Sequence, residues 1–407
     1  MKRRALFSLI VFALLLPTAA SRTIQSTSKV AVPSAVTIPF ELVNRHIVLK
    51  VQVDHSRPLS FLLDTGDQFS IINLDRAKEL GLKLEGEVRV GGAGSALSTG
   101  AFVRDSLFTL PGYPGFSQPL TLALPIGKMA SRLGHDFDGI IGGEFIKQFV
   151  LELDYQAKVI KLHDKEKFTY SGPGESVPIK LNSAGHPILE AEVTPLGSAP
   201  VAGSFVLDVG SSGALVLHSP FVAGHNLLGP NLKTIKAIGV GGAGGLVTAR
   251  IGRVSELKIG RFRIRSPITL FAEDKAGAFA DAALVGNIGQ QIAGKFRLFL
   301  DYSHNRIIFE PNKLFAESFD RAFGGLALVA EGKDYRTFRI SELLENSPGT
   351  EAGLQKDDII TAIDGKPAVD LSLTKVLELF ERPVAYKLTV RRGDQTLQVT
   401  LTPRKLV

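Results

Sequence analysis

The chain has 407 residues and a formal net charge of +7, with 44% hydrophobic residues, 21% charged residues and no cysteine. At roughly 100–200 residues per domain, this length predicts two to four folded units, and the composition excludes a disordered chain. Without cysteine there can be no disulfide framework, thiolate zinc site, iron–sulfur cluster or cysteine nucleophile. The lysines and arginines are scattered, so we predict no nucleic-acid partner.

Residues 1–20 have the pattern of a secretory signal peptide. The chain starts with three basic residues (2–4), continues with a short apolar run (5–16) and reaches small residues at Ala19 and Ala20. A basic start, an apolar run and small residues before a cut are typical of such signals. We therefore expect an exported protein, periplasmic or secreted, with residues 21–36 as a linker. No later segment is long enough for a membrane span, so none is expected after cleavage.

Three motifs occur twice, in the same order, at nearly the same spacing. The copies lie about 150 residues apart, longer than any solenoid unit, so they indicate a duplicated domain. The paired motifs are Asp64-Thr65-Gly66 with Asp208-Val209-Gly210, Val90–Gly94 with Val240–Gly244, and Phe149–Tyr155 with Phe296–Tyr302.

The strand patterns and frequent turn signals of both copies are typical of β structure. We predict a mainly β fold with two duplicated acid-protease-like β lobes, residues 37–169 and 187–313, joined by a linker over 170–186. Short helices are expected over 74–80 and 144–149. The composition changes after residue 314, and residues 322–407 form a separate α+β domain of plausible size.

The two Asp-X-Gly turns suggest a paired-carboxylate site. Each turn follows an apolar strand, and a pseudo-twofold axis would bring Asp64 and Asp208 together. Two carboxyl groups within about 3 Å share one proton, and their apparent pKa values split. The ionised member can activate a water while the neutral member protonates a carbonyl oxygen. Such a pair hydrolyses amides without a metal or any other cofactor, and none is predicted.

Residues 37–313 resemble the aspartic peptidases of the pepsin/retropepsin clan, in their bacterial, two-lobed, secreted form. The resemblance rests on the two Asp loops and on an apolar-apolar-Gly motif after each, matched by 140–142 and by Leu284-Val285-Gly286. It implies that Asp64 and Asp208 are the catalytic pair. The residues implied to support the catalytic loops are Thr65, Gly66, Val209, Gly210 and Ser211. The residues implied to form substrate-binding flaps are Gly91, Gly92, Gly94, Gly241, Gly242 and Gly244.

Two positions depart from the family pattern. The family expects Thr or Ser after each Asp, where this chain has Thr65 but Val209. Valine cannot form the hydrogen bond that braces the lobes, a loss of about 1 kcal/mol. Asp67 follows Gly66 where Ser or Ala is usual. An Asp there is expected to cap its own turn; facing inward, it would instead raise the pKa of the pair.

Other sequence patterns give weaker signals. The segment from Gly239 to Gly244 matches a dinucleotide-binding fingerprint, but no helical pattern follows it, so we interpret it as a β-hairpin. The eight histidines show no metal-ligand spacing. The chain has no Gly-X-Ser-X-Gly motif, which argues against a serine hydrolase of that type.

Residues 322–407 resemble a bacterial PDZ domain. Three spaced motifs carry this resemblance: Gly325-Leu326-Ala327-Leu328, Ser347-Pro-Gly with Ala352-Gly-Leu354, and 358–360 with 363–367. In that family an extended peptide adds to a strand edge, and glycine-turn N–H groups hold its terminal carboxylate. The resemblance therefore implies an open strand edge over 325–329 that faces a helix over 373–380, with Leu326 and Leu328 lining the groove or packing in the core.

Together these patterns predict a monomeric, exported aspartic endopeptidase. Its predicted partners are a peptide or protein substrate at the Asp64/Asp208 pair and peptide C-termini at the PDZ groove. The alternative is a catalytically degenerate peptide-binding or scaffold protein on the same fold, which Val209 favours. The retained Asp64, Thr65 and Asp208 and both apolar-apolar-Gly motifs favour the enzyme.

Overall fold

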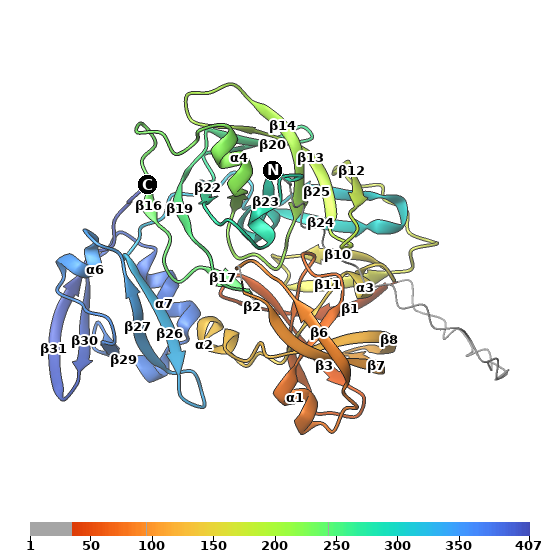
Figure 1. The fold of residues 1–407 in the computed structure, drawn as a ribbon, viewed down its shortest axis with the longest axis horizontal. Helices are drawn as coiled ribbons and strands as arrows, with labels where there is room; N and C mark the ends of the chain where they lie inside the picture. The colour runs from red at the N-terminus through yellow and green to blue at the C-terminus, as the bar shows by residue number, and fades with distance from the viewer. Residues whose placement is uncertain (1–34, 95, 243) are drawn as a thin grey trace, which may run out of the picture. The chain divides into compact units, whose positions relative to one another are not determined.

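The computed structural model describes residues 35–94, 96–242 and 244–407 (Figure 1). The expected signal peptide, residues 1–20, and residues 21–34 of the expected linker lie outside these ranges. Within them, no helix has the length and apolar character needed to cross a membrane. The described chain is predominantly β, as the sequence predicts, and divides into two β lobes and a PDZ domain.

The first lobe is a mixed sheet in which neighbouring strands are mostly antiparallel. Its central strands are apolar on both faces: every residue of β4 and of β9 is buried. In sheet order its strands are β2 (Glu41–Val43), β3 (His46–Val53), β4 (Leu59–Leu63), β9 (Gly139–Ile141), β5 (Ser70–Asn73), β8 (Tyr113–Leu124), β7 (Ser98–Leu110) and β6 (Glu85–Val90). Its helices are α1 (Leu74–Glu79), α2 (Met129–Leu133) and α3 (Gly143–Ile146).

The second lobe repeats this arrangement (Figure 1). Its main strands, in sheet order, are β13 (Pro187–Thr194), β14 (Val201–Leu207), β23 (Gly286–Ile288), β15 (Leu215–Leu217), β22 (Ile268–Ala272), β19 (Ala249–Arg253) and β16 (Ile235–Lys236). Beside them lie the hairpins β20 (Glu256–Ile259) with β21 (Phe262–Arg265), and β17 (Gly241–Gly242) with β18 (Gly245–Leu246). Its helices are α4 (Ser219–Gly224) and α5 (Gln290–Ala293).

A shared antiparallel sheet joins the lobes. At its centre β10 (Val150–Asp154) pairs with β24 (Phe296–Asp301), which are copies of the same motif, so the pseudo-twofold axis passes between them. The outer strands are β1 (Ala35–Pro39), β11 (Val159–His163), β25 (Arg306–Pro311) and β12 (Glu175–Leu181). The interpretation of 170–186 as a plain linker was therefore wrong, since β12 lies within it and pairs with both β25 and β13.

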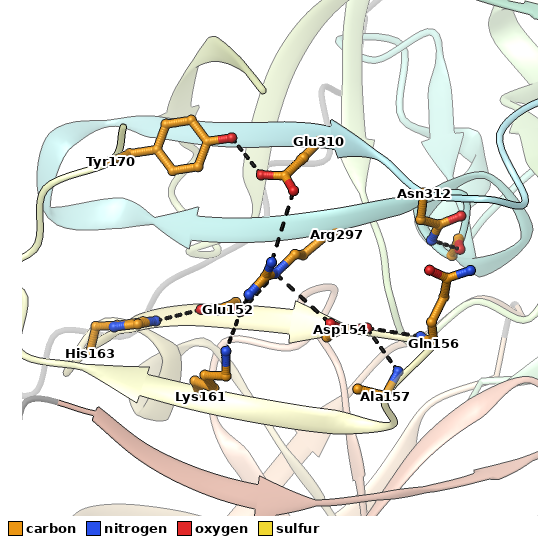
Figure 2. Close-up of polar contacts among 11 residues, drawn as sticks. Glu152, Asp154, Gln156, Ala157, Lys161, His163, Tyr170, Arg297, Glu310 and Asn312 are labelled. Carbon is orange, nitrogen blue, oxygen red and sulfur yellow. Dashed lines mark hydrogen bonds and ion pairs between the residues drawn. The ribbon is translucent and has the colours of Figure 1, made fainter. Parts of the chain in front are cut away.

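A network of charged side chains links neighbouring strands of this joining sheet (Figure 2). Arg297 on β24 reaches Glu152 on β10, which also accepts from Lys161 and His163 on β11 at 2.9 and 2.8 Å. Burial alone would raise the pKa of Glu152, but the hydrogen bonds from these three side chains and the charge of Arg297 lower it to about 2. Glu152 is therefore ionised throughout the mildly acidic range.

The second apolar-apolar-Gly motif lies three residues later than the sequence indicated. In the first lobe β9 runs parallel to β4, and Ile141 O accepts from Asp64 N at 3.0 Å. In the second lobe β23 runs parallel to β14, and Ile288 O accepts from Asp208 N at 2.9 Å. The counterpart of Ile140-Ile141-Gly142 is thus Asn287-Ile288-Gly289. The prediction of Leu284-Val285-Gly286 was wrong because it required two apolar residues before the glycine. The structural counterpart begins with a polar residue, Asn287.

The PDZ domain has its own core, which lies between a sheet and a helix. Helix α7 (Leu373–Phe380) begins where the Ser372 hydroxyl accepts from Lys375 N, and it buries Leu373, Val376 and Phe380 against the sheet. The strands, in sheet order, are β26 (Leu326–Glu331), β27 (Thr337–Leu343), β28 (Ile359–Ile363), β30 (Tyr386–Arg392) and β31 (Gln395–Leu401), with β29 (Lys366–Pro367) beside β28 and α6 (Pro348–Glu351) after β27.

Candidate active site

The two Asp loops meet at the interface between the lobes. Asp64 follows β4 and Asp208 follows β14, so the duplicated strands deliver their carboxyl groups from opposite sides. A β-carbon built on Gly66 would lie 3.1 Å from Asp64 Oδ1 and 3.1 Å from Asp208 Cγ. A β-carbon on Gly210 would lie 2.0 Å from Asp64 Cγ. A side chain at Gly210 would therefore displace the carboxyl group of Asp64, and one at Gly66 would crowd both carboxyl groups.

The carboxyl group of Asp208 lies close enough to act on that of Asp64. Burial, the neighbouring charge of Asp208 and a hydrogen bond with it raise the pKa of Asp64 well above its usual range. Each Asp also accepts a hydrogen bond from its own loop. Gly66 N donates to Asp64 Oδ1 at 2.7 Å, and Ser211 N donates to Asp208 Oδ1 at 2.9 Å. The arrangement suits a pair that holds one proton between them.

Thr65 forms half of the brace between the lobes. Its hydroxyl donates to Leu207 O at 2.6 Å and accepts from Val209 N at 2.9 Å, and its side chain is buried. Val209 is fully buried at the matching place in the second lobe. Because valine has no hydroxyl, the reciprocal pair of bonds cannot form, as the sequence indicated. The loops nevertheless meet, since one complete set of bonds crosses the interface.

Asp67 lies within electrostatic reach of Asp64 and Asp208, and no N–H group of the described residues donates to its side chain, so the expectation that it caps its own turn was wrong. The turn amide of Gly66 bonds to Asp64 instead. Burial and the charge of Asp208 raise the pKa of Asp67 to about 7, and Asp67 in turn contributes to the raised pKa of Asp64. The site thus contains three neighbouring carboxyl groups, which disfavours full ionisation near neutral pH.

Sequence reasoning missed a polar pair behind Asp208. Asn287 Nδ2 donates to Asp208 Oδ2 at 2.9 Å, and Asn287 Oδ1 lies 2.9 Å from His218 Nε2. Both side chains are buried, His218 with 1% and Asn287 with 9% of its surface exposed. Aligning the two lobes on their later repeat, Phe149–Tyr155 with Phe296–Tyr302, and counting back to the position of Ile140 could have found Asn287.

Several further polar groups lie near the pair. The buried Tyr302 hydroxyl has no hydrogen-bond partner among the described residues, and the charge of Asp64 helps burial to raise its pKa. Burial lowers the pKa of His46 to about 4, with Gly210 as a backbone neighbour. His186 lies within electrostatic reach of Asp208. No group of three or more His, Asp or Glu side chains in the described ranges could hold a metal ion.

The glycine-rich segments of the two lobes meet each other. The β6–β7 hairpin carries Gly91, Gly92 and Gly94 at its tip, and the β17–β18 hairpin carries Gly241, Gly242 and Gly244. Ala96 N donates to Gly244 O at 3.0 Å, and a β-carbon on Gly94 would lie only 2.1 Å from that oxygen. Gly241–Gly242 pairs with Gly245–Leu246 in a β-hairpin, which supports the interpretation of this region as a hairpin and not a nucleotide-binding loop. Both lobes thus contribute a hairpin, and the tips are in backbone contact.

In the described ranges the outer edge of β26 is unpaired, as the sequence predicts, but the first lobe packs against this strand and against the start of α7. Helix α2 lies against β26, and Gly134, directly after α2, packs on Leu373 at the start of α7. Asn44 N donates to Thr374 Oγ1 at 2.9 Å, and Arg45 pairs with Glu381 at the end of α7. In the described part of the chain, β26 forms ladder pairs with β27 alone.

The predicted PDZ residues divide by face along β26. Leu328 is buried in the domain core, with 8% of its surface exposed, and Leu326 packs at its edge. Ala327 points the other way, toward the second lobe: a methyl group on Gly239 would lie 2.7 Å from its β-carbon. Gly325 has a φ of +72° and packs on Ser347, so it sets the turn before the strand.

Comparisons with known proteins agree with these domains. The sequence profile of the aspartyl protease family matches residues 49–145, which include Asp64 and the first apolar-apolar-Gly motif. The PDZ domain profile matches residues 339–392.

Three curated relatives match segments of 138, 67 and 64 residues. A probable CtpA-like serine protease of Staphylococcus haemolyticus is 25% identical over 33% of this chain and 26% of its own length. Serine protease HTRA1 of Xenopus laevis is 33% identical and human serine protease HTRA3 is 38% identical, each over 16% of this chain and 14% of its own length. The chain spans about a quarter or less of each relative's length. It carries an aspartyl-protease-like domain followed by a C-terminal PDZ domain.

Proposed function

We propose that the protein is an exported aspartic endopeptidase that uses Asp64 and Asp208 to activate water. The observation that carries this proposal is that both carboxyl groups lie beside Gly66. Each lies about 3.1 Å from the position that a β-carbon on Gly66 would occupy. The raised pKa of Asp64 supports it, because a pair that holds one proton has an acid and a base at the same pH. The serine protease names of the relatives belong to those proteins, which this chain matches over short segments.

The proposed reaction needs no covalent intermediate. The ionised carboxyl group takes a proton from a water between the pair, and the water oxygen attacks the peptide carbonyl carbon. The protonated carboxyl group gives its proton to the carbonyl oxygen, which forms a neutral tetrahedral diol. The first group then returns its proton to the nitrogen as the C–N bond breaks, and the second recovers a proton from a diol hydroxyl.

The two hairpins support a role in substrate binding. Their tips touch through the backbones of Gly94 and Gly244, so an extended peptide would enter only after the tips separate. Val209 favours the alternative, a non-catalytic peptide-binding protein, because it removes half of the interlobe brace. The Thr65 bonds to Leu207 and Val209 weigh against that alternative, since they keep the Asp loops in register.

The PDZ domain is proposed to bind apolar peptide C-termini between β26 and α7. Because α2 and Gly134 pack there, binding in the full chain requires this segment of the first lobe to move.

A screen of a peptide library between pH 3 and pH 8 tests the proposed function. We expect cleavage with an optimum at mildly acidic pH, no loss on chelation of metal ions, and inhibition by a statine-type transition-state analogue. Loss of cleavage with a serine-directed acylating reagent, or with a chelator, would contradict the proposal.

A further inference from the structure

The catalytic loops of the two lobes have different neighbours at equivalent positions. In the first lobe, the strand beside the Asp loop presents Ile140, which is 3% exposed and lies in an apolar cluster. In the second lobe the equivalent residue is Asn287, whose amide donates to Asp208 Oδ2 at 2.9 Å. An amide in a buried, otherwise apolar strand is retained only where its hydrogen bonds are satisfied. This asymmetry marks Asp208 as different from Asp64.

His218 holds the other end of this amide. It occupies the N-cap position of α4, directly after β15, and its ring lies 5.7 Å from the ring of Phe279. Its Nδ1 lies 3.2 Å from the carbonyl oxygen of Asp281, and its Nε2 lies 2.9 Å from Asn287 Oδ1. A backbone carbonyl only accepts hydrogen bonds, so Nδ1 carries a hydrogen.

The state of Nε2 then determines the direction of the amide. If Nε2 also carries a hydrogen, Asn287 Oδ1 faces it and the amide NH₂ group donates to an ionised Asp208. If Nε2 carries no hydrogen, the Asn287 amide must flip so that its NH₂ group donates to Nε2. The amide oxygen then faces Asp208, which must be protonated to donate a hydrogen bond to it. A hydrogen on His218 Nε2 is therefore compatible with an ionised Asp208, and its absence with a protonated Asp208.

We propose that His218 and Asn287 form a polar relay that positions Asp208 as the ionised, water-activating member of the pair and leaves Asp64 as the acid. This inference rests on the proposed function. The raised pKa of Asp64 is consistent with it. The other ionisable groups near the pair among the described residues are Asp67 and His186, which lie within reach of Asp208, Tyr302, which lies near Asp64, and His46, which lies beside Gly210. None of these is hydrogen-bonded to Asp208 Oδ2, which receives its bond from Asn287.

Three variants of the full chain test the relay. Asn287→Ile copies the first lobe and removes the donor, while His218→Phe removes the group that orients the amide. His218→Gln is the matched control, because its amide donates to Asn287 Oδ1 without a ring. The readout is the pH profile of kcat, whose acidic limb reports ionisation of the base.

We expect Asn287→Ile and His218→Phe to move the acidic limb upward by about one pH unit and to lower kcat at least tenfold. We expect His218→Gln to restore the wild-type limb. A purely structural role would change the thermal midpoint and leave the limb in place. Profiles of Asn287→Ile and His218→Phe that superimpose on the wild type would overturn the relay.

A second measurement separates this inference from the proposed function. If the wild-type protein cleaves no peptide, the proposed function fails, and the relay is read from carboxyl ¹³C NMR titrations instead. The Asp208 signal, assigned by its loss in Asp208→Asn, should titrate at higher pH in Asn287→Ile than in the wild type. An unchanged Asp208 midpoint would overturn the relay, whatever the activity.

Discussion

The Thr65 hydroxyl crosses between the lobes to accept a hydrogen bond from Val209 N at 2.9 Å while it donates to Leu207 O at 2.6 Å. The reverse bonds are missing because Val209 has no hydroxyl. The duplicated loops are therefore braced from one side, in a fold whose lobes are otherwise related by a pseudo-twofold axis.

Val209→Thr should complete the brace. By symmetry, the new hydroxyl would reach Leu63 O and Thr65 N, and we expect the free energy of unfolding to rise by about 1 kcal/mol. Chemical denaturation measures this change. Val216→Thr is the matched control, because Val216 is equally buried but lies in an apolar cluster. It should lose stability, since its hydroxyl would be desolvated. A comparable loss in Val209→Thr would show that the loop excludes a second hydroxyl.

Asp67→Asn should change how stability depends on pH. The pKa of Asp67 is raised to about 7 in the folded protein, against its ordinary value of 3.8 when unfolded. Its contribution to stability is therefore complete below about pH 3.8 and is lost as the pH rises through about 7. At pH 8 the variant should be more stable than the wild type by roughly 2 kcal/mol, a figure reduced for screening by water. At pH 3.5 the two should be equal; equal stability at pH 8 as well would contradict the inward-facing position.

Glu152→Gln should weaken the joint between the lobes at neutral pH. The folded pKa of Glu152 is about 2, below its ordinary value of 4.5, so its contribution is complete above pH 4.5 and is lost between there and about pH 2. We expect a loss of at most about 3 kcal/mol at pH 7 and a much smaller one at pH 2. Glu166→Gln, a change at an exposed residue of the following turn, is the control. A loss that does not depend on pH would mean that packing, not charge, explains the effect.

Gly134→Ala should release the PDZ groove from the first lobe. A β-carbon at Gly134 would lie 2.4 Å from Leu373 Cβ, so the two surfaces cannot stay in contact. We expect a peptide with an apolar C-terminus to bind the full-length variant at least fivefold more tightly than the wild type, measured by fluorescence anisotropy. Gly81→Ala has nearly the same positive φ, +68° against +66°, but nothing within 4 Å. It therefore reproduces the backbone strain alone. Equal affinity in all three proteins would show that the contact does not gate the groove.

The sequence indicated the duplication and the paired Asp loops because these depend on local motifs that occur twice. It also predicted α7 with its correct bounds, since apolar spacing and the Ser372 cap are both local signals. It failed where the answer depends on contacts between distant segments. Asn287 is polar at a place where an apolar residue was sought, and its partner Asp208 lies 79 residues away. The packing of Gly134 on Leu373 likewise depends on how the first lobe and the PDZ domain dock, which the sequence motifs of these two domains do not encode.

The direction of Asp67 was missed for a related reason. An Asp after Asp-Thr-Gly is compatible with a local cap, and the sequence alone cannot show that Gly66 N already bonds to Asp64. Only the assembled loop brings Asp67 within electrostatic reach of Asp208.

The most direct test of the central claim compares two neighbouring substitutions in the second loop. Asp208→Asn removes the carboxylate, whereas Ser211→Ala keeps the backbone N–H that donates to Asp208 Oδ1. With a peptide identified by the library screen, we expect turnover to fall at least a thousandfold in Asp208→Asn. We expect Ser211→Ala to stay within about tenfold of the wild type, because the backbone bond remains. The reverse result, with turnover abolished in Ser211→Ala and retained in Asp208→Asn, would contradict the proposed aspartic mechanism.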